Sequence, residues 1–385
     1  MNARRATRGF RLVATAAVGG ALLVSTVGTL GAVAANSGKA RAAALVKKYS
    51  PVPSAKSIVG VTPFTKRPPT GKTIAYINCG VAPCSTKFSP GIHAAAAVLG
   101  WTAKDYNYTP ANPVTLQSAI QSAINDNVTA IVATAGQPTV TITGQKAAKA
   151  KGIIWINGFG AGTWKATTTV TAGLFYGPVE GQFDGTLMAA YLAQQSAKGP
   201  VHTALLRVKA FDSVHLPKIV GLKKGLATMC KACTYTEITE SAEQQIGNQS
   251  SSVVVSYLQA HPTINYIIFE SGQPAAGIQA ALATAGLSSK VKVVGFAPTD
   301  PQISSVAKGT EDMWVYECDT CAGWYFADAA ALILAKKPVT TITSVPLPTQ
   351  VATKQSVPAT PPIPYAFPTT SQLKAKFSAI WRIAS

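Results

Sequence analysis

The sequence predicts an α/β protein with two lobes, each built on a parallel sheet that is covered by helices. At 385 residues the chain is long enough for two domains of about 150 residues each. From Lys72 onward, short runs rich in β-branched residues alternate with Ala-rich helical stretches, which is typical of parallel sheets. The order strand, turn, helix, strand occurs twice, at Val128–Asn157 and again at Ile264–Phe296, and this internal repeat indicates two similar halves.

The N-terminal segment has the pattern of an export signal. Four arginines precede an uncharged run of 24 residues: Arg4, Arg5, Arg8 and Arg11, then Leu12–Ala35. We interpret residues 1–35 as a signal peptide cleaved near Ala34 or Ala35, or as a retained membrane anchor, since the run is long enough to span a bilayer. No Cys ends the run, so a lipoprotein signal is absent. We therefore expect an exported protein, located in the cell envelope or secreted.

The positive charge of the chain is concentrated in its first quarter. The chain has 34 Lys and Arg against 15 Asp and Glu, a net charge of +19, and no acidic residue precedes Asp105. Residues 36–71 carry several of these basic side chains among prolines and show no convincing apolar period, so we expect a solvated linker there. No nucleic-acid motif or basic-aromatic stripe accompanies the charge, and we expect no nucleic-acid partner.

Buried strands and intervening helices are expected in a regular order after this linker. Helices are predicted at Pro90–Leu99 and Leu116–Asn125. Six short apolar runs predict the strands: Ile74–Asn78, Ala130–Thr134, Ile153–Asn157, Thr203–Val208, Tyr266–Glu270 and Val291–Phe296.

Two glutamines occupy equivalent places in the two repeats. Gln137 lies in Gly136-Gln137-Pro138 after one strand, and Gln273 lies in Gly272-Gln273-Pro274 after its counterpart. Ligand sites of open parallel sheets lie at the carboxyl ends of the strands. The two glutamines are therefore predicted at two facing rims of a cleft.

Several segments between about Lys72 and Val357 resemble the type I periplasmic binding proteins, the ribose-binding-protein-like solute receptors of ABC importers. The most specific are Asn265–Ala281 and Val293–Phe296, which resemble a strand, turn and helix of the family followed by its Val-Val-Gly-Phe strand. Gly177–Gly185 resembles the first crossing between lobes, Val351–Val357 the closing strand, and Phe377–Trp381 the terminal helix.

This resemblance implies two Rossmann-like lobes joined by three hinge crossings. The N-terminal lobe would comprise residues 72–175 and 318–340, the C-terminal lobe residues 176–317, and residues 341–385 the closing strand and a C-terminal tail. The family captures a small-molecule ligand by hinge closure and delivers it to an ABC permease in the membrane. We accordingly expect a monomeric binding protein that is not an enzyme and has no cofactor.

The departures from the family pattern concern the ligand. Where sugar-binding members carry charged pairs, this sequence reads Asn157-Gly158-Phe159, Leu216-Pro217-Lys218, Ser271-Gly272 and Ala297-Pro298. Each sugar hydroxyl buried without a partner costs about 1 to 3 kcal/mol, so loss of these pairs favours an apolar or aromatic solute. Glu317 matches a family Gln at the second crossing. The expected ligand-binding residues are Gln137, Asn157, Phe159, Trp164, Phe211, Asp212, Ser271, Gln273, Phe296 and Glu317.

Six cysteines occur as three close pairs, Cys79 with Cys84, Cys230 with Cys233, and Cys318 with Cys321. An even number in an exported chain predicts disulfides, and short spacing favours the local pairing among the fifteen possible ones. Two alternatives remain: zinc held by the two Cys-x-x-Cys pairs, and a redox site at Cys318-Asp-Thr-Cys321.

Signatures of catalysis are scarce. The four histidines show no metal-ligand spacing, and no nucleophile elbow or phosphate loop occurs, so we expect no catalytic residues and no metal. Besides the importer receptor for an apolar solute, the sequence is compatible with a sugar-binding receptor of the same family, a ligand-presenting sensor subunit, and an exported thiol redox protein.

Overall fold

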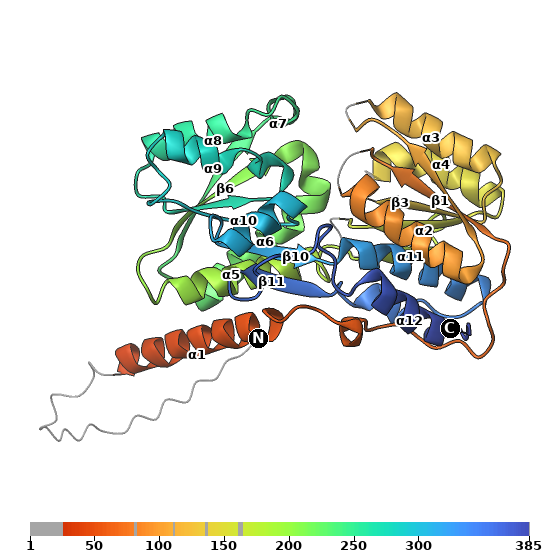
Figure 1. The fold of residues 1–385 in the computed structure, drawn as a ribbon, viewed down its shortest axis with the longest axis horizontal. Coiled ribbons are helices and arrows are strands. Elements are labelled where there is room, and N and C mark those ends of the chain that lie inside the picture. The colour runs from red at the N-terminus through yellow and green to blue at the C-terminus, as the bar shows by residue number, and fades with distance from the viewer. Residues whose placement is uncertain (1–25, 81–82, 111, 135–137, 161–164, 385) are drawn as a thin grey trace, which may run out of the picture.

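The computed structural model describes residues 26–80, 83–110, 112–134, 138–160 and 165–384. Two α/β lobes lie side by side, each with its own twisted sheet (Figure 1). Most of the expected signal or anchor segment lies outside the described residues. Within the described ranges no helix has the length and hydrophobicity that a bilayer crossing requires.

The N-terminal lobe contains a five-stranded parallel sheet in the order β2-β1-β3-β4-β5. Its strands are β1 (Thr73–Asn78), β2 (Thr102–Asn107), β3 (Ala130–Thr134), β4 (Ile154–Gly158) and β5 (Ala172–Leu174). Successive side chains of a strand face opposite sides of the sheet. In β1, Ile74 and Tyr76 enter one core, and Ala75 and Ile77 enter the other.

Helices cover both faces of this sheet. One face packs against α3 (Pro113–Asn125) and α4 (Pro138–Ala150). The other packs against α2 (Ser89–Leu99), α11 (Asp319–Leu334) and α12 (Thr370–Ile380), with the side chains of α11 almost entirely buried.

The C-terminal lobe contains a six-stranded sheet in the order β11-β10-β9-β8-β6-β7, parallel except for the antiparallel edge strand β11. Its strands are β6 (His202–Val208), β7 (Thr234–Glu240), β8 (Tyr266–Phe269), β9 (Lys292–Phe296), β10 (Met313–Glu317) and β11 (Thr349–Thr353).

The C-terminal lobe also contains six helices, and the N-terminal helix α1 (Thr26–Tyr49) packs against it. α1 packs with α5 (Gly181–Gln195) and α6 (Asp212–Met229) on one side. α8 (Ser250–Ala260), α9 (Ile278–Thr284) and α10 (Asp300–Lys308) cover the other side, and the short α7 (Ala242–Ile246) follows β7.

The chain passes between the lobes at the places that the fold class requires: between β5 and α5, between β10 and α11, and between α11 and β11. Two more passages, from α1 to β1 and from β11 to α12, lie along the lower side of the molecule in Figure 1. Residues 341–385 are thus not a simple tail, because β11 belongs to the C-terminal lobe and α12 to the core of the N-terminal lobe.

The expectation of a solvated linker at residues 36–71 is wrong. α1 occupies residues up to Tyr49, with Ala42 and Val46 buried against the C-terminal lobe. Ile58 and Phe64 are buried in the core of the N-terminal lobe. The segment is rich in exposed Lys and Arg, so its sequence shows only a narrow stripe of small apolar residues. That stripe is enough to bury one face of the helix.

The six predicted strands agree with the structure to within one residue, whereas β2, β5, β7 and β10 were not among them. β5 has only three residues, and β10 is a fully buried inner strand whose apolar run was overlooked. β2 and β7 are edge strands, and their side chains are largely partly or fully exposed. Edge strands of this kind lack the continuous apolar run that identifies a buried parallel strand.

Candidate functional site

A cleft of about 650 Å³ lies between the lobes, at the carboxyl ends of strands from both sheets. Segments that follow β1, β4, β5, β8, β9 and β10 all contribute to its lining. Two parallel sheets that present their carboxyl ends to one space form a ligand cleft of the expected kind.

The wall of the N-terminal lobe is aromatic. The ring of Phe159 lies 5.1 Å from that of Phe88 and 5.4 Å from that of Phe175, centroid to centroid, and Phe326 lies behind them. Gly158 permits this packing, since a Cβ there would lie 2.5 Å from the Phe326 ring. Rings at these separations attract one another and offer an apolar surface to a ligand.

Three residues without glycine's conformational freedom have positive φ where strands meet the cleft. They are Phe159 (φ 59°), Phe175 (φ 58°) and Ala297 (φ 45°), and all three line the cleft. Each directly follows a strand, β4, β5 and β9 respectively. Such conformations cost about 1 to 3 kcal/mol and tend to gather at functional sites, so the backbone supports the cleft as the binding site.

The wall of the C-terminal lobe is polar. Phe211, His215 and Lys218 line it from the start of α6, together with Ser271 and Gln245 from other segments. The Gln245 Oε1 and His215 Nδ1 atoms are buried and have no hydrogen-bond partner among the described residues. Burial, with a smaller contribution from the Lys218 ammonium, lowers the pKa of His215 to about 3, so its imidazole is neutral.

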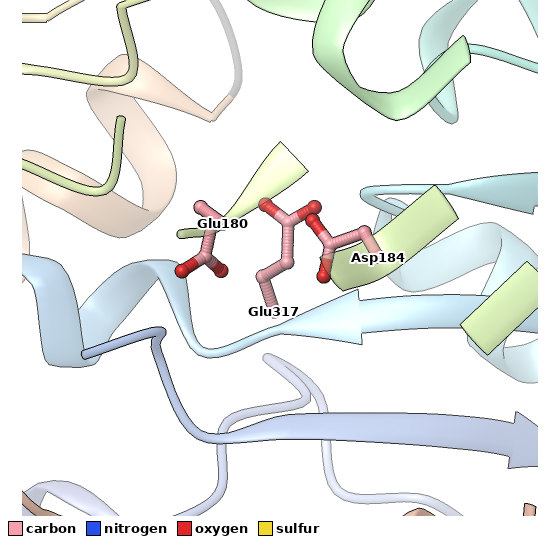
Figure 2. Close-up of side chains that lie close together, drawn as sticks. All are labelled: Glu180, Asp184 and Glu317. Carbon is pink, nitrogen blue, oxygen red and sulfur yellow. The ribbon is translucent and has the colours of Figure 1, made fainter. Parts of the chain in front are cut away.

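The floor of the cleft is a buried group of charged side chains at the first two crossings. Figure 2 shows the side chains of Glu180, Asp184 and Glu317 close together. One carboxylate oxygen of each lies within 4.8 Å of the others. Lys218 Nζ lies 2.5 Å from Glu317 Oε1. The helices α5 and α6 approach closely enough for this because Gly185 has no Cβ, which would lie 2.1 Å from the Lys218 carbonyl oxygen.

The carboxyl groups of this floor have different pKa values, because burial and mutual repulsion affect them unequally. Burial opposes the ionisation of Glu317, but the Lys218 ammonium together with hydrogen bonds from Asp184 and Lys218 outweighs it and lowers the Glu317 pKa. Burial and then the Glu317 charge raise the pKa values of Glu180 and Asp184 well above the ordinary carboxyl range. The same two causes raise the pKa of Asp319 to about 8. Glu317 and Lys218 are therefore the charged pair, and protonated forms are favoured for the other carboxyls.

A second ion pair joins the lobes at the cleft. Lys87 Nζ, from the N-terminal lobe, lies 2.8 Å from Asp300 Oδ1 at the start of α10 in the C-terminal lobe. It also donates to the Tyr365 carbonyl oxygen at 3.2 Å, and the Tyr365 amide donates to Asp300 at 3.0 Å. The side chains of Lys87 and Asp300 both line the cleft, so this contact connects the two walls directly.

The cysteines are paired locally in the structure. The sulfur atoms are 2.08 Å apart for Cys79–Cys84, 1.94 Å for Cys230–Cys233 and 2.02 Å for Cys318–Cys321. The first pair lines the cleft, and the third begins α11 directly after the second crossing. Bonds at these places restrict the segments that shape the cleft.

Five of the predicted ligand-binding residues line the cleft: Phe159, Phe211, Ser271, Gln273 and Glu317. They come from both lobes and from the second crossing. Gln137 and Trp164 lie outside the described residues.

Three predicted residues do not line the cleft. The Asn157 side-chain oxygen accepts a hydrogen bond from Trp155 Nε1, and both carboxylate oxygens of Asp212 accept hydrogen bonds from Arg207. Phe296 is fully buried beneath the floor, with its ring centroid 5.5 Å from Lys218 Nζ. Each lies outside the cleft lining and bonds to or packs against neighbouring side chains.

Sequence reasoning missed several residues of the cleft, above all Phe88, Phe175, Glu180, Lys87 and Asp300. A signal existed for Phe175 and Glu180, because both belong to the short first crossing after β5. No local signal existed for Lys87 and Asp300, which are 213 positions apart in the chain.

Together, the two-lobed fold and the inter-lobe cleft define a solute-binding protein of the type I periplasmic class. Solved structures with this fold include an ABC sugar transporter subunit from Rhodobacter sphaeroides 2.4.1, with 18% identity over 74% of this chain and 99% of that chain and a TM-score of 0.61. GanP, a glucose-galactose binding protein from Geobacillus stearothermophilus, is 17% identical over 75% of this chain and 100% of that chain, with a TM-score of 0.62.

A third structure, an ABC transporter solute-binding protein from Agrobacterium vitis bound with α-D-tagatopyranose, is 20% identical over 74% of this chain and 95% of that chain, with a TM-score of 0.62. No curated protein matches the sequence. The model of the periplasmic binding protein domain family matches residues 85–338, and the chain belongs to this family. Members bind small-molecule solutes outside the cytoplasm, work with ABC permeases and are not enzymes.

Proposed function

We propose that the protein is an exported receptor that captures a small hydroxylated solute of the sugar class in the inter-lobe cleft and presents it to an ABC permease. The observation that carries this proposal is the pairing of an aromatic wall with neutral hydrogen-bonding groups across one cleft. The C–H face of a sugar ring packs on aromatic rings, and its hydroxyls need partners such as Gln245, His215 and Ser271.

The names of the similar structures support this choice over the apolar or aromatic solute that the sequence suggested. The ligands named for two of them are sugars, glucose and galactose for GanP and tagatopyranose for the Agrobacterium vitis protein. At the level of the sequence, missing charged residues and the presence of aromatic ones favour an apolar or aromatic solute. Aromatic walls suit both classes, because a sugar ring also has an apolar face.

An apolar or aromatic solute remains the second candidate, favoured by one observation. The charged side chains at the cleft are mostly engaged with one another, Lys218 with Glu317 and Lys87 with Asp300, which leaves few charged partners for hydroxyls. Calorimetry of the full-length chain against a monosaccharide panel and an aromatic and terpenoid panel separates the two. A response confined to the second panel would overturn the sugar proposal.

Hinge closure is expected on binding, because a ligand that contacts both walls favours the closed state over the open one. Small-angle scattering should show a smaller radius of gyration at saturating ligand. The change should be lost or weakened in the double variant Phe159→Ala and Phe211→Ala, which removes one ring from each lobe. An unchanged radius together with tight binding would contradict closure.

A thiol redox function is not favoured by the burial of its candidate cysteines. Cys318 and Cys321 are fully buried, so a partner thiol cannot reach their sulfur atoms without a rearrangement. We propose that all six cysteines are oxidised in the exported protein, and that the pairs Cys79–Cys84 and Cys318–Cys321 stabilise segments at the cleft. Alkylation without reductant should label none of them, and stoichiometric zinc or labelling of Cys318 or Cys321 would contradict the proposal.

A further inference from the structure

We propose that the solute carries a positively charged amino group and that this group binds where the acidic floor of the cleft meets the aromatic wall. This inference rests on the proposed solute-binding function and names the chemical class of its ligand more closely. The residues that carry it are Glu180, Asp319, Phe175 and Phe159, all of which line the cleft.

The first argument is the imbalance of charged groups at the cleft. The two lysines that line it each have a carboxylate partner, Asp300 for Lys87 and Glu317 for Lys218. Glu180 and Asp319 form no ion pair among the described residues, and Asp184 lies beside Glu317 just behind the lining. In the empty cleft burial favours the protonated forms of these carboxyls. An ammonium group on the solute would favour ionisation of one of them, as Lys218 does for Glu317, and no described ion pair competes for Glu180 or Asp319.

The second argument is the position of Glu180 Oε1. The side chain is 2% exposed, and its other oxygen, Oε2, accepts a hydrogen bond from the Leu347 amide at 2.8 Å. Oε1 has no hydrogen-bond partner among the described residues, although Glu180 belongs to the cleft lining. A buried oxygen without a donor is costly, and a donor on the ligand removes that cost.

The third argument is that aromatic rings and Glu180 line the same cleft, with Phe175 five residues before Glu180 in the chain. Phe175 and Glu180 belong to the same short crossing, and the amide of Glu180 donates to the Tyr176 carbonyl oxygen at 3.0 Å. The Phe175 ring lies 5.4 Å from Phe159 and 5.6 Å from Tyr325, centroid to centroid. Aromatic faces attract ammonium groups, and they do so most strongly where water is excluded.

A bare metal ion fits this place less well than an ammonium group. Lys218 Nζ lies 2.5 Å from Glu317 Oε1, so the cluster formed by the Glu180, Asp184 and Glu317 carboxyls already has one cation. Phenylalanine rings contribute no ligand atoms to a metal but do contact an ammonium group attached to an organic solute. A space of about 650 Å³ also suits an organic molecule.

Matched pairs of probes that differ only in charge test the inference. Calorimetry at pH 6.5 with the full-length chain should compare choline with its neutral carbon analogue 3,3-dimethylbutan-1-ol, and D-glucosamine with D-glucose. We expect the charged member of at least one pair to bind about tenfold or more tightly. Equal or tighter binding of the neutral member in both pairs, or no binding of either charged probe, would overturn the inference.

Substitutions of the floor carboxyls test whether the preference for a charged probe originates there. Glu180→Gln should reduce the preference for the charged probe about tenfold, and Glu243→Gln, on the exposed α7, should leave it unchanged. Asp319→Asn provides a second test if Glu180→Gln proves unstable by circular dichroism. A preference that survives both substitutions would overturn the assignment to this floor.

The same titrations separate this inference from the proposed function. Binding of neutral sugars that is weakened by Phe159→Ala, without any preference for charge, would retain the solute-binding function and reject the amino group. Absence of binding by both the sugar and the aromatic panels would count against the solute-binding function itself.

Discussion

The wall that the N-terminal lobe contributes to the cleft is made of rings in contact with one another, whereas the C-terminal lobe contributes side chains held by ion pairs. Phe88, Phe159 and Phe175 contact one another on the first wall. On the second, Lys218 binds Glu317 at the cleft, and behind the lining Arg207 binds Asp212 and Glu237. Apolar contact is non-directional, but buried ion pairs depend on geometry and on protonation. The two walls should therefore respond differently to substitution and to pH.

The largest effect is expected where the ion pair of the floor is broken. Lys218→Met leaves the Glu317 carboxylate buried without its cation, and loss of one partner of a buried pair costs about 3 to 5 kcal/mol of unfolding free energy. Urea unfolding at pH 8 measures this loss. The double variant Lys218→Met with Glu317→Gln should recover most of it, and a loss below about 1 kcal/mol in the single variant would contradict the role of the pair.

The next effect compares the two walls through ligand affinity. Phe159→Ala removes the central ring of the aromatic wall and should weaken binding by about 10- to 100-fold, in the range of an interface hot spot. Phe211→Ala removes a single ring from the polar wall and should cost about tenfold or less. Calorimetry with the solute found by panel screening measures both, with Tyr257→Ala on the surface of α8 as control. A larger loss for Phe211→Ala would reverse the assignment of the walls.

The architecture could be predicted from the sequence because the inner strands are continuous apolar runs and the two halves repeat. The cleft could be predicted only in part. Glutamine and phenylalanine residues directly after strands gave Gln273 and Phe159, but the inter-lobe pair Lys87–Asp300 and the floor pair Lys218–Glu317 join residues 213 and 99 positions apart. The first pair exists only once both lobes are folded and docked, and the second only once the C-terminal lobe is folded, so no local pattern marks them.

The expectation of a solvated linker was wrong for a different reason, because here the local composition itself was misleading. Prolines and lysines between residues 36 and 71 suggested a solvated chain, and the buried Ala42 and Val46, four positions apart, were too small to produce a visible apolar period. Their burial depends on the surface that α5 and α6 present to α1. Local composition therefore outweighed a short packing stripe that only the tertiary structure reveals.

A smaller effect is expected from pH, and the floor should contribute to it beside other buried carboxyls such as Glu270 and Asp328. The Asp319 pKa is raised to about 8 by burial and by Glu317, while an unfolded Asp titrates near 3.9. The folded state therefore keeps a proton that the unfolded state loses, and stability falls as pH rises from about 4 to about 8. Thermal unfolding should show a Tm several degrees higher at pH 5 than at pH 8, at about 2 to 4 °C per kcal/mol. Asp319→Asn should reduce this difference, and an equal Tm at both pH values would contradict the raised pKa.

The smallest effect is expected from relief of backbone strain. Ala297 and Phe159 both have a positive φ and lie on opposite walls, so glycine substitutions there separate the backbone contribution to stability from that of the side chain. Ala297→Gly removes a strain of about 1 to 2 kcal/mol but adds about 0.4 to 1 kcal/mol of chain entropy to the unfolded state, so it should stabilise the protein by up to about 1 kcal/mol. Phe159→Gly relieves the same strain yet loses the ring contacts with Phe88 and Phe175, so it should destabilise. Phe159→Gly should nevertheless unfold at higher urea than Phe159→Ala, because only the glycine adopts φ 59° without strain. If Ala297→Gly destabilises the protein, the left-handed conformation after β9 is not strained, and the positive φ values at the cleft lose their meaning as a mark of function.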